Sequence, residues 1–402
     1  MSDEYSEYYE SDDGAGEPGH RERAAAGRAR RWGRRDWRLL HRIFRYLSVT
    51  ELATAAAVCR KWNVSIDNDT RWSSLCQEMG IYKRPFKDLP WRRVYIRALA
   101  TAKNFNSRTS SYTSCLLRKG HKDAVWALAL GKTKVYSGGS DRVAKMWDVN
   151  ALNCRETLKS FEGGVWALDY DPVSGLVAAG DTEGFVHVFD GETGETKSSF
   201  QAHTTTVSAL QLDGGSLITG SFDNSVVVHD LETQVQTHVL QGARAGGHKF
   251  HVWCLQAAHG RVVSGGWDCK LKVWDLKSAT CTANLVGHSG PVRAVAFDGA
   301  RVVSGSWDKS LKMWDLAYPA SPLHTLTGHS GPVSSLAVDE SKIVSGSYDG
   351  TVRIWALAGA PPPCIRTLKA NTGGVLAVAL DWRRVYAAGK DKKIRVFDFA
   401  AE

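Results

Sequence analysis

The chain has 402 residues, of which 43% are hydrophobic and 23% are charged, and its formal net charge is +9. This composition fits a protein with a large buried core and excludes a chain that is disordered throughout. No apolar run approaches the roughly 18 residues that span a membrane, and the acidic start of the chain does not resemble a secretory signal. We therefore expect no membrane partner and a cytoplasmic location, a nuclear location or both. The eight cysteines form no Cys-x-x-Cys motif, which favours reduced thiols.

Charge is distributed unevenly along the chain. Residues 1–20 carry seven carboxylates and no Lys or Arg, whereas residues 21–110 carry 21 basic and 7 acidic side chains. The first 35 residues combine low hydrophobicity with runs of like charge, which predicts a disordered tail that is acidic and then basic. The run Arg28–Arg35 is of a kind that nucleic acid can bind. A solvated tail is the simpler interpretation, so nucleic acid is not expected as a partner.

Residues 36–76 have the pattern of short amphipathic helices. Apolar side chains fall on one helical face between Leu39 and Leu47. Ser48-Val-Thr-Glu51 then matches a capping box and predicts the start of a second helix. Because two short helices bury little surface alone, we expect a third helix around Trp72 or a partner to cover them.

The string from Leu39 to Leu75 resembles the F-box, although the Leu-Pro with which that family usually starts falls on Arg35-Asp36. The resemblance implies a small all-α domain over residues 36–76 that docks the adaptor of an SCF-type ubiquitin ligase. It assigns adaptor contact to the apolar positions of the motif, which are Leu39, Leu40, Ile43, Phe44, Leu47, Leu52, Val58, Cys59 and Trp62. Residues 77–110 would form a helical linker packed through Trp91, Tyr95 and Phe105.

Residues 111–402 contain seven copies of one pattern, most clearly between Gly287 and Asp315. Each copy runs from Gly-His or its counterpart to a closing aromatic or His residue, and these closing residues lie 40 to 45 residues apart. They are Trp147, Phe189, His229, Trp274, Trp314, Trp355 and Phe397. A repeat of this length and these ends is the signature of a four-stranded propeller blade. The fold class is therefore mainly β, a seven-bladed propeller preceded by the helical segments.

The spacing inside the copies predicts a buried chain of hydrogen bonds. After His288, Ser304 comes at +16, Asp308 at +20 and Trp314 at +26, and three other copies share this spacing. Such a network is tolerated in a β-structure when every member has a partner. The second, third and seventh copies depart from it at one or more positions.

The stretch from Tyr112 to Phe399 resembles the WD-repeat family. In that family the strand order is offset from the sequence repeat. The resemblance therefore implies that Tyr112–Leu117 supplies the outer strand of the last blade, which removes the exposed sheet edge.

Nothing in the sequence favours catalysis. The glycine-rich turns lack the Lys-Ser/Thr of a phosphate-binding loop, and the His-Asp pairs have a structural role in every copy, so no cofactor or metal is expected. Together the two resemblances imply a non-catalytic substrate receptor. The F-box would dock the adaptor and through it the cullin–RING scaffold, while the propeller holds the target protein or degron peptide. The alternative is a WD-repeat scaffold without ligase function that assembles a signalling or RNA-processing complex.

Two positions in each repeat are expected to face the mouth of the central channel, one just after the Val at +4 and one just before the Asp. These positions are rich in aromatic residues, which suggests a binding hot spot, although rings that only pack between blades would give the same pattern. The candidates for target contact, with Arg244 in an inserted loop, are Trp126, Trp166, Phe222, Arg244, Trp253, Trp267, Arg293, Trp307, Tyr348 and Lys390. The few cations argue against a multi-Arg phosphate clamp and predict an aromatic-anchored segment with one acidic or phosphorylated group near Arg293.

Overall fold

The computed structural model describes residues 70–78, 81, 91–106, 112–117, 120–148, 151, 153–241, 246–357, 360–370 and 373–400. By its contacts the chain divides into two units, Met1–Arg71 and Trp72–Glu402. The predicted tail and all nine residues expected to contact an adaptor lie outside the described residues. These nine are Leu39, Leu40, Ile43, Phe44, Leu47, Leu52, Val58, Cys59 and Trp62.

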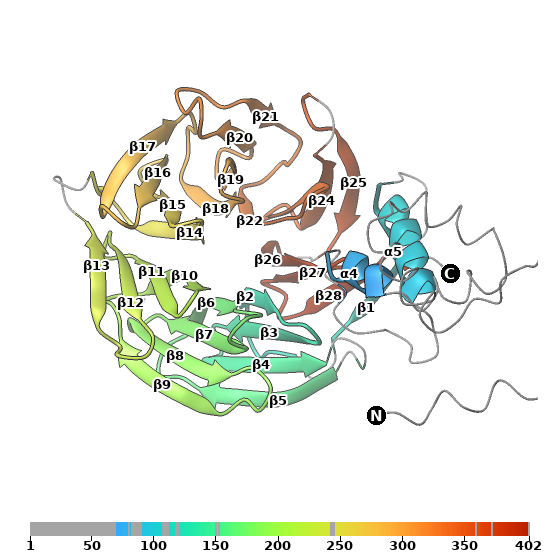
Figure 1. The fold of residues 1–402 in the computed structure, drawn as a ribbon, viewed down its shortest axis with the longest axis horizontal. Helices are drawn as coiled ribbons and strands as arrows, with labels where there is room; N and C mark the ends of the chain where they lie inside the picture. Colours follow the sequence, from blue (N-terminus) through green and yellow to red (C-terminus); the bar gives the residue numbers. More distant parts are fainter. Residues whose placement is uncertain are drawn as a thin grey trace, which may run out of the picture. The chain divides into compact units, whose positions relative to one another are not determined.

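Seven antiparallel four-stranded sheets follow one another around a ring (Figure 1), which confirms the predicted propeller. Each blade is one sheet, and in blades 1 to 6 the strands run in chain order from the centre outward. Blades 1 to 3 consist of β2 (Val125–Leu130), β3 (Lys134–Gly139), β4 (Val143–Asp148), β5 (Asn153–Ser160), β6 (Val165–Tyr170), β7 (Leu176–Asp181), β8 (Phe185–Asp190), β9 (Thr196–Gln201), β10 (Val207–Asp213), β11 (Ser216–Ser221), β12 (Val226–Asp230) and β13 (Gln236–Leu240).

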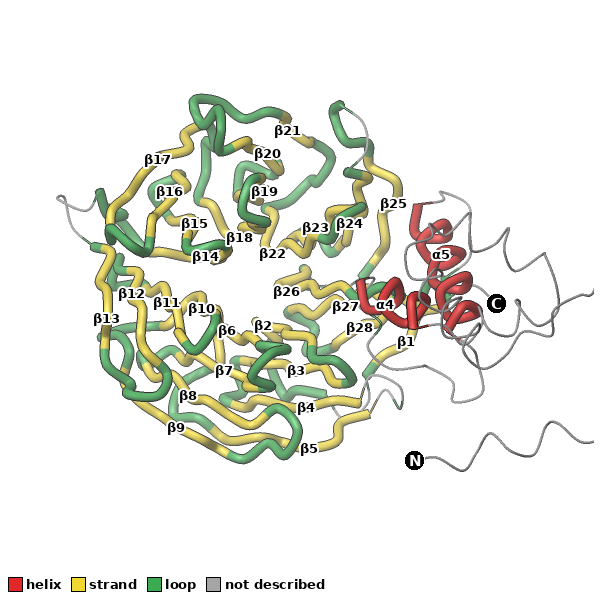
Figure 2. Tube along the Cα trace, in the orientation of Figure 1, coloured by secondary structure: helices red, strands yellow, loops and turns green. Residues whose placement is uncertain are grey.

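Blades 4 to 6 repeat this arrangement. They consist of β14 (Val252–Ala258), β15 (Arg261–Gly266), β16 (Lys270–Asp275), β17 (Thr280–Val286), β18 (Val292–Phe297), β19 (Arg301–Ser306), β20 (Leu311–Asp315), β21 (His324–Leu326), β22 (Val333–Val338), β23 (Lys342–Ser347), β24 (Thr351–Ala356) and β25 (Cys364–Lys369). Figure 2 shows in green the loops that join the successive strands of each blade.

Blade 7 closes the ring with strands from both ends of the propeller sequence. Its sheet has β26 (Val375–Leu380), β27 (Arg384–Gly389) and β28 (Ile394–Asp398), and its outer strand is β1 (Thr113–Leu116). Thr113 lies opposite Asp398 and Leu116 opposite Arg395. The prediction that Tyr112–Leu117 completes the last blade is confirmed, and this pairing holds the first and last strands of the ring together.

Strand position in the blade explains the sequence pattern of each strand. In the inner strand β2, buried Val125, Ala127 and Ala129 alternate with half-buried residues that line the central channel. In the second strand β3 every residue is buried, because neighbouring blades cover both faces. A strand covered on both faces has no need to alternate, so after Lys134 the strand continues with apolar and small residues and one Tyr.

A glycine in the second strand allows neighbouring blades to pack closely together. A Cβ built on Gly305 would lie 2.6 Å from Cγ1 of Val333 in the next blade, and one on Gly138 would lie 2.4 Å from Cγ1 of Val165. The same contact recurs at Gly180, Gly220, Gly265 and Gly346, each against the first Val of the next inner strand. The glycine after the Ser and the Val at +4 are therefore two halves of one contact between blades.

The predicted hydrogen-bond chain is present in four blades. In blade 5, Nδ1 of His288 lies 2.7 Å from the Asp308 carboxylate and Nε2 lies 2.8 Å from Oγ of Ser304, which accepts a 2.9 Å bond from Nε1 of Trp314. Blades 1, 4 and 6 repeat it around Ser137, Ser264 and Ser345. Burial alone would raise the pKa of Asp308, but the hydrogen bonds from His288 and Ser310 hold it well below its usual range.

Blade 3 keeps only part of this chain. His203 bonds Asp223 at 2.9 Å and Thr219 at 2.8 Å. His229 occupies the position that is Trp in the four blades with the complete hydrogen-bond chain. His229 is 1% exposed, and neither ring nitrogen has a hydrogen-bond partner among the described residues. Burial lowers the pKa of His229 to about 4, with a further contribution from the nearby His203. Blade 2 instead has apolar Phe161, Ala179 and Phe189 at the corresponding positions.

Two helices precede the ring in the described sequence, α4 (Thr70–Glu78) and α5 (Trp91–Asn106). A small core joins α4 to α5, with Cys76 from α4 and Val94 and Ala98 from α5. Three partly buried side chains pack against it, Trp91 and Tyr95 from α5 and Trp382 from blade 7. Phe105 is fully buried and stacks on Phe399 with ring centroids 4.0 Å apart. Helix α5 is thus packed against blade 7 through the aromatic residues that the sequence marks as its packing face.

Candidate functional site

The central channel has a small cavity where the inner strands begin. Its volume is about 200 Å³, and every blade contributes the residue that follows the first Val of its inner strand. These residues are Trp126, Trp166, Ser208, Trp253, Arg293, Ser334 and Leu376, which we call the channel ring. The first set of predicted positions therefore converges on one cavity.

Two members of the channel ring serve the fold. The hydroxyl of Ser208 donates to the carbonyl of Val252 at 2.5 Å, and that of Ser334 donates to the carbonyl of Val375 at 2.6 Å. Both acceptors belong to the inner strand of the next blade. Serine at this position therefore joins neighbouring blades, and its only donor is used within the fold.

Seven aromatic rings of the predicted set form one continuous arc around this cavity. Their order by contact is Trp126, Trp166, Phe222, Trp253, Trp267, Trp307 and Tyr348, with successive ring centroids 4.6 to 6.5 Å apart. Such separations are those of interacting aromatic pairs. The rings pack against one another, as the alternative interpretation predicts, yet Trp267 remains 41% exposed and offers a large apolar surface to a partner.

The two described cations of the set lie on this arc. Lys390 places its Nζ 4.8 Å from the centre of the Tyr348 ring, at an exposed position. The Arg293 guanidinium lies 5.5 Å from the Trp166 ring and 5.6 Å from the Trp253 ring, so it is held between two indoles. All nine described residues of the predicted set are thus connected, and the tenth, Arg244, lies outside the described residues.

Hydrogen-bond donors in this region lack acceptors. The Nε1 atoms of Trp166, Trp253 and Trp307 are buried and have no partner among the described residues. Arg293 donates one 3.3 Å bond to the carbonyl of Trp253, and no carboxylate of the described chain pairs with it. Burial lowers the pKa of Arg293. An unpaired buried donor costs about 1–3 kcal/mol, so the arrangement favours a ligand that brings acceptors.

The sequence interpretation overlooked His251, which contacts the arc, and the exposed Phe250 that precedes it in the chain. His251 lies 4.8 Å from the Phe222 ring, and its Nδ1 lies 2.5 Å from the Phe222 carbonyl. Phe250 is 54% exposed. The signal was present, because the other blades have Gly, Pro, Thr, Asp or Ala at these two positions after Gly-His or its counterpart.

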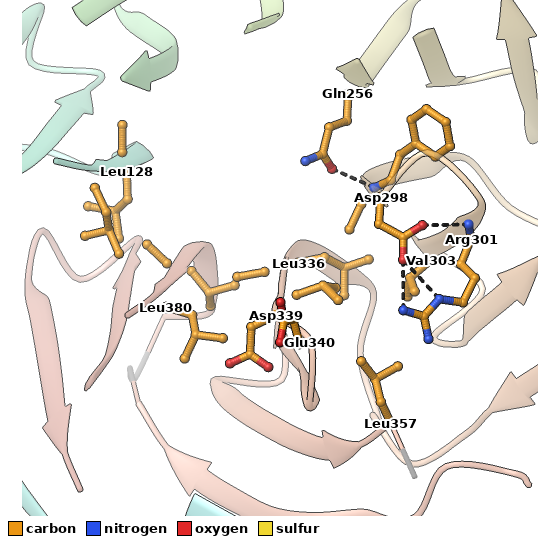
Figure 3. A pocket seen from close by; sticks show the side chains of 18 of the residues that line it. Leu128, Gln256, Asp298, Arg301, Val303, Leu336, Asp339, Glu340, Leu357 and Leu380 are labelled. Atoms are coloured by element: carbon orange, nitrogen blue, oxygen red, sulfur yellow. Dashed lines mark hydrogen bonds and ion pairs between the residues drawn. The ribbon is translucent and has the colours of Figure 1, made fainter. Parts of the chain in front are cut away.

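The opposite end of the channel holds a larger cavity of about 590 Å³ (Figure 3), with apolar walls and several carboxylates. Several of its polar groups have partners within the fold. Asp298 pairs with Arg301, Asp339 pairs with Lys342, and Gln256 accepts a bond from the backbone of Phe297 (2.8 Å). Burial raises the pKa of Asp169, which accepts a 2.9 Å bond from the backbone of Leu212, to about 6. The bonds of Gln256 and Asp169 join neighbouring blades, and the two ion pairs lie within blades 5 and 6, so this end carries a weaker case for ligand binding.

The His–Asp–Ser chains do not make a catalytic site. Ser137, Ser264, Ser304 and Ser345 have no exposed surface, so no substrate could reach their hydroxyl groups. Among the residues that the structure describes, no group of three or more His, Cys, Asp or Glu side chains is placed to hold a metal ion. No helix within those described ranges is long and apolar enough to cross a membrane.

Comparison with protein families finds two matches in the chain. The model described as F-box-like matches residues 38–78. The model described as WD domain, G-beta repeat matches seven times, at residues 113–148, 152–190, 194–230, 236–275, 279–315, 320–356 and 362–398. These seven segments cover more than half of the chain. Each segment contains the outer strand of one blade and the three inner strands of the next blade.

Similar proteins match part of this chain. A mitogen-activated protein kinase kinase kinase A from Dictyostelium discoideum is 24% identical over 64% of this chain and 28% of its own length. F-box/WD repeat-containing protein 7 from Drosophila melanogaster is 30% identical over 31% of this chain and 10% of its own length. The chain therefore spans less than a third of these relatives.

A solved structure supports the fold alone. The WD40 β-propeller domain of Doa1 superimposes with a TM-score of 0.64 over 72% of this chain and 97% of that domain, at 20% identity. Seven matched repeats, a closed ring and an F-box-like segment ahead of it place this chain in the F-box/WD-repeat family.

Proposed function

We propose that this protein is the substrate-recognition subunit of an SCF-type ubiquitin ligase. The observation that carries the proposal is the order of its parts, an F-box-like segment at residues 38–78 followed by a closed seven-bladed propeller. The F-box-like segment would dock the adaptor, and through it the cullin–RING scaffold, while the aromatic arc would hold the target. The subunit would act by bringing the target close to the ubiquitin-charged enzyme, which raises the effective concentration of that enzyme near the target.

The packing of helix α5 supports this division of labour. Phe105 is buried against Phe399, and Asn104 donates a 3.4 Å bond to the Phe399 carbonyl. A helix anchored in this way to blade 7 would limit the directions in which the ring can move relative to a docked adaptor. A restricted range raises the effective concentration of target lysines near the active site.

Adaptor capture is the first test. The full chain, co-expressed with the SCF adaptor, should elute with it as a stable complex. Leu40→Asp places a charge on the expected docking face and should abolish the complex, whereas Tyr318→Ala, at an exposed residue (78%) of blade 5, should leave it intact. Failure of the unaltered chain to bind any SCF adaptor would refute the proposal.

Target capture is the second test. Trp267→Ala combined with Trp307→Ala removes two neighbouring rings of the arc, 5.5 Å apart, and should reduce recovery of target proteins from cells without loss of the adaptor. A folded double variant that captures the same targets at the same level would show that the arc does not bind them.

The alternative function is a scaffold for a signalling or RNA-processing complex. The relative named as a protein kinase kinase kinase favours it, because the similarity there covers 64% of this chain. A scaffold would assemble with such a complex and leave the adaptor unbound. The co-expression experiment therefore separates the two functions.

A further inference from the structure

We propose that the channel cavity receives a single carboxylate from the target, held by Arg293 and framed by the indoles of Trp166 and Trp253. This inference rests on the proposed function, since it names the chemistry of the target segment. The partner would be a peptide segment whose Asp, Glu or C-terminal carboxylate enters the channel while its neighbouring residues lie across the aromatic arc.

The position and the unused N–H donors of the Arg293 guanidinium suit the binding of an anion. Its guanidinium lines the cavity, rests between the Trp166 and Trp253 rings, and has no carboxylate partner among the described residues. A guanidinium carries five N–H donors in a planar fork and no acceptor. One 3.3 Å bond to a backbone carbonyl leaves most of these donors unused.

The indoles point to the same ligand chemistry. Trp253 is 7% exposed and lines the cavity, as does Trp166, and neither indole N–H has a partner among the described side chains and backbone groups. An indole nitrogen only donates. The unpaired indole and guanidinium groups all donate, so they favour a ligand that only accepts hydrogen bonds, and an ionised carboxylate meets this condition.

Charge balance favours a carboxylate over a phosphate. Arg293 is the only Lys or Arg among the described residues that line this cavity, and Lys390, the other described cation of the predicted set, is not one of them. A phosphate monoester carries a charge of about −1.5 to −2, so it would leave about one negative charge without a partner in a confined site. A carboxylate carries one charge and matches one guanidinium in a bidentate pair.

The fold does not require arginine at this position. Blades 3 and 6 have Ser208 and Ser334 there, and each hydroxyl bonds the next inner strand at 2.5–2.6 Å. The Arg293 side chain instead donates a longer hydrogen bond, 3.3 Å, to the carbonyl of Trp253 in the preceding blade. Arg293→Ser therefore replaces the cation with a residue that the same chain uses at the same position, and the variant should fold.

The experiment uses the full chain and a random twelve-residue peptide library that includes free C-termini. Peptides selected on the unaltered chain are synthesised in three forms, with the selected acid, with its amide, and with phosphoserine in its place. Each form is titrated against the unaltered chain, against Arg293→Ser, and against Lys309→Ser, which removes an exposed cation of the same face that does not line the cavity.

The unaltered chain should prefer the acid to the amide by about 10- to 100-fold, and Arg293→Ser should bind both forms equally weakly. Lys309→Ser should retain the preference, with an affinity change below about threefold. A purely structural role of Arg293 would weaken all three peptides by the same factor, so loss of the acid-to-amide preference is the informative readout.

Three results would overturn the inference: selected peptides without a shared acid, an acid preference that survives Arg293→Ser, or tighter binding of the phosphoserine form. Failure of the proposed function is a different observation, since acid-dependent binding without adaptor capture would leave the carboxylate site standing and remove the ligase. Adaptor capture without acid-dependent binding would do the reverse.

Discussion

His229 is the clearest defect in the propeller core, and replacing it with Phe should stabilise the protein. The ring is 1% exposed, and both nitrogens lack partners among the described residues. Each buried polar group without a partner costs about 1–3 kcal/mol. Blades 2 and 7 have Phe189 and Phe397 at this position, so the blade can hold a phenyl ring. We expect His229→Phe to raise the free energy of unfolding by about 1–3 kcal/mol at pH 7.5.

The same substitution should change the response to acid. The pKa of His229 is lowered from 6.5 to about 4 in the folded state by burial. Between these values the unfolded chain binds a proton that the folded chain does not bind, so stability falls as the pH falls from 6.5 to about 4 and is unaffected above 6.5. The full loss is about 3 kcal/mol, of which about 2 kcal/mol is reached at pH 5.

Urea unfolding of the full chain at pH 7.5 and pH 5 measures both effects. The unaltered chain should lose about 2 kcal/mol more between the two pH values than His229→Phe. His238→Gln, in the outer strand β13, removes an imidazole that is not fully buried and serves as the control. Equal pH dependence in the unaltered chain and in His229→Phe would show that His229 is protonated or paired in the folded state, contrary to this reasoning.

Three further substitutions test the contacts that hold the propeller together. Ser304→Ala leaves the Trp314 N–H and the His288 acceptor unpaired and should cost about 2–4 kcal/mol in urea unfolding; a cost below about 1 kcal/mol would contradict the buried chain. Gly305→Ala places a Cβ 2.6 Å from a Val333 methyl and should cost about 1–3 kcal/mol in the same assay, whereas a neutral effect would mean that the blades can separate. Phe105→Ala should cost about 3–5 kcal/mol of helix docking, measured as faster amide hydrogen exchange in α5 with unchanged exchange in the inner strands.

Much of the fold could be predicted from the sequence because one local pattern, which forms most of a blade, recurs seven times along the chain. The spacing from His288 to Trp314 predicted bonds that the structure shows at 2.7–2.9 Å. The closing strand β1 followed from the offset of strands and repeats in the family that the sequence resembles. Apart from the pairing of β1 with β28, the hydrogen-bond chain and strand pairs inside a blade join residues fewer than 30 positions apart, and regular spacing reveals them.

Contacts between blades could not be read in this way. The approach of Gly305 to Val333, the bond from Ser208 to Val252 and the stacking of Arg293 on Trp166 each join residues of different blades. Their geometry depends on how the sheets pack, which spacing alone does not encode. The predicted adaptor contacts, from Leu39 to Trp62, lie outside the described residues and stay predictions.

Comparing equivalent positions among the seven blades separates structural residues from candidate functional ones. A position that is nearly the same in every blade, such as the Gly at 305 or the Val at 333, is accounted for by contacts that every blade must make. The channel ring differs from blade to blade, and where it is Ser it still joins the blades. Packing therefore does not require Trp or Arg at that position in the other blades. Because indole and guanidinium groups with unpaired donors lower stability, their presence beside one cavity agrees with the proposed ligand, which would supply the missing acceptors.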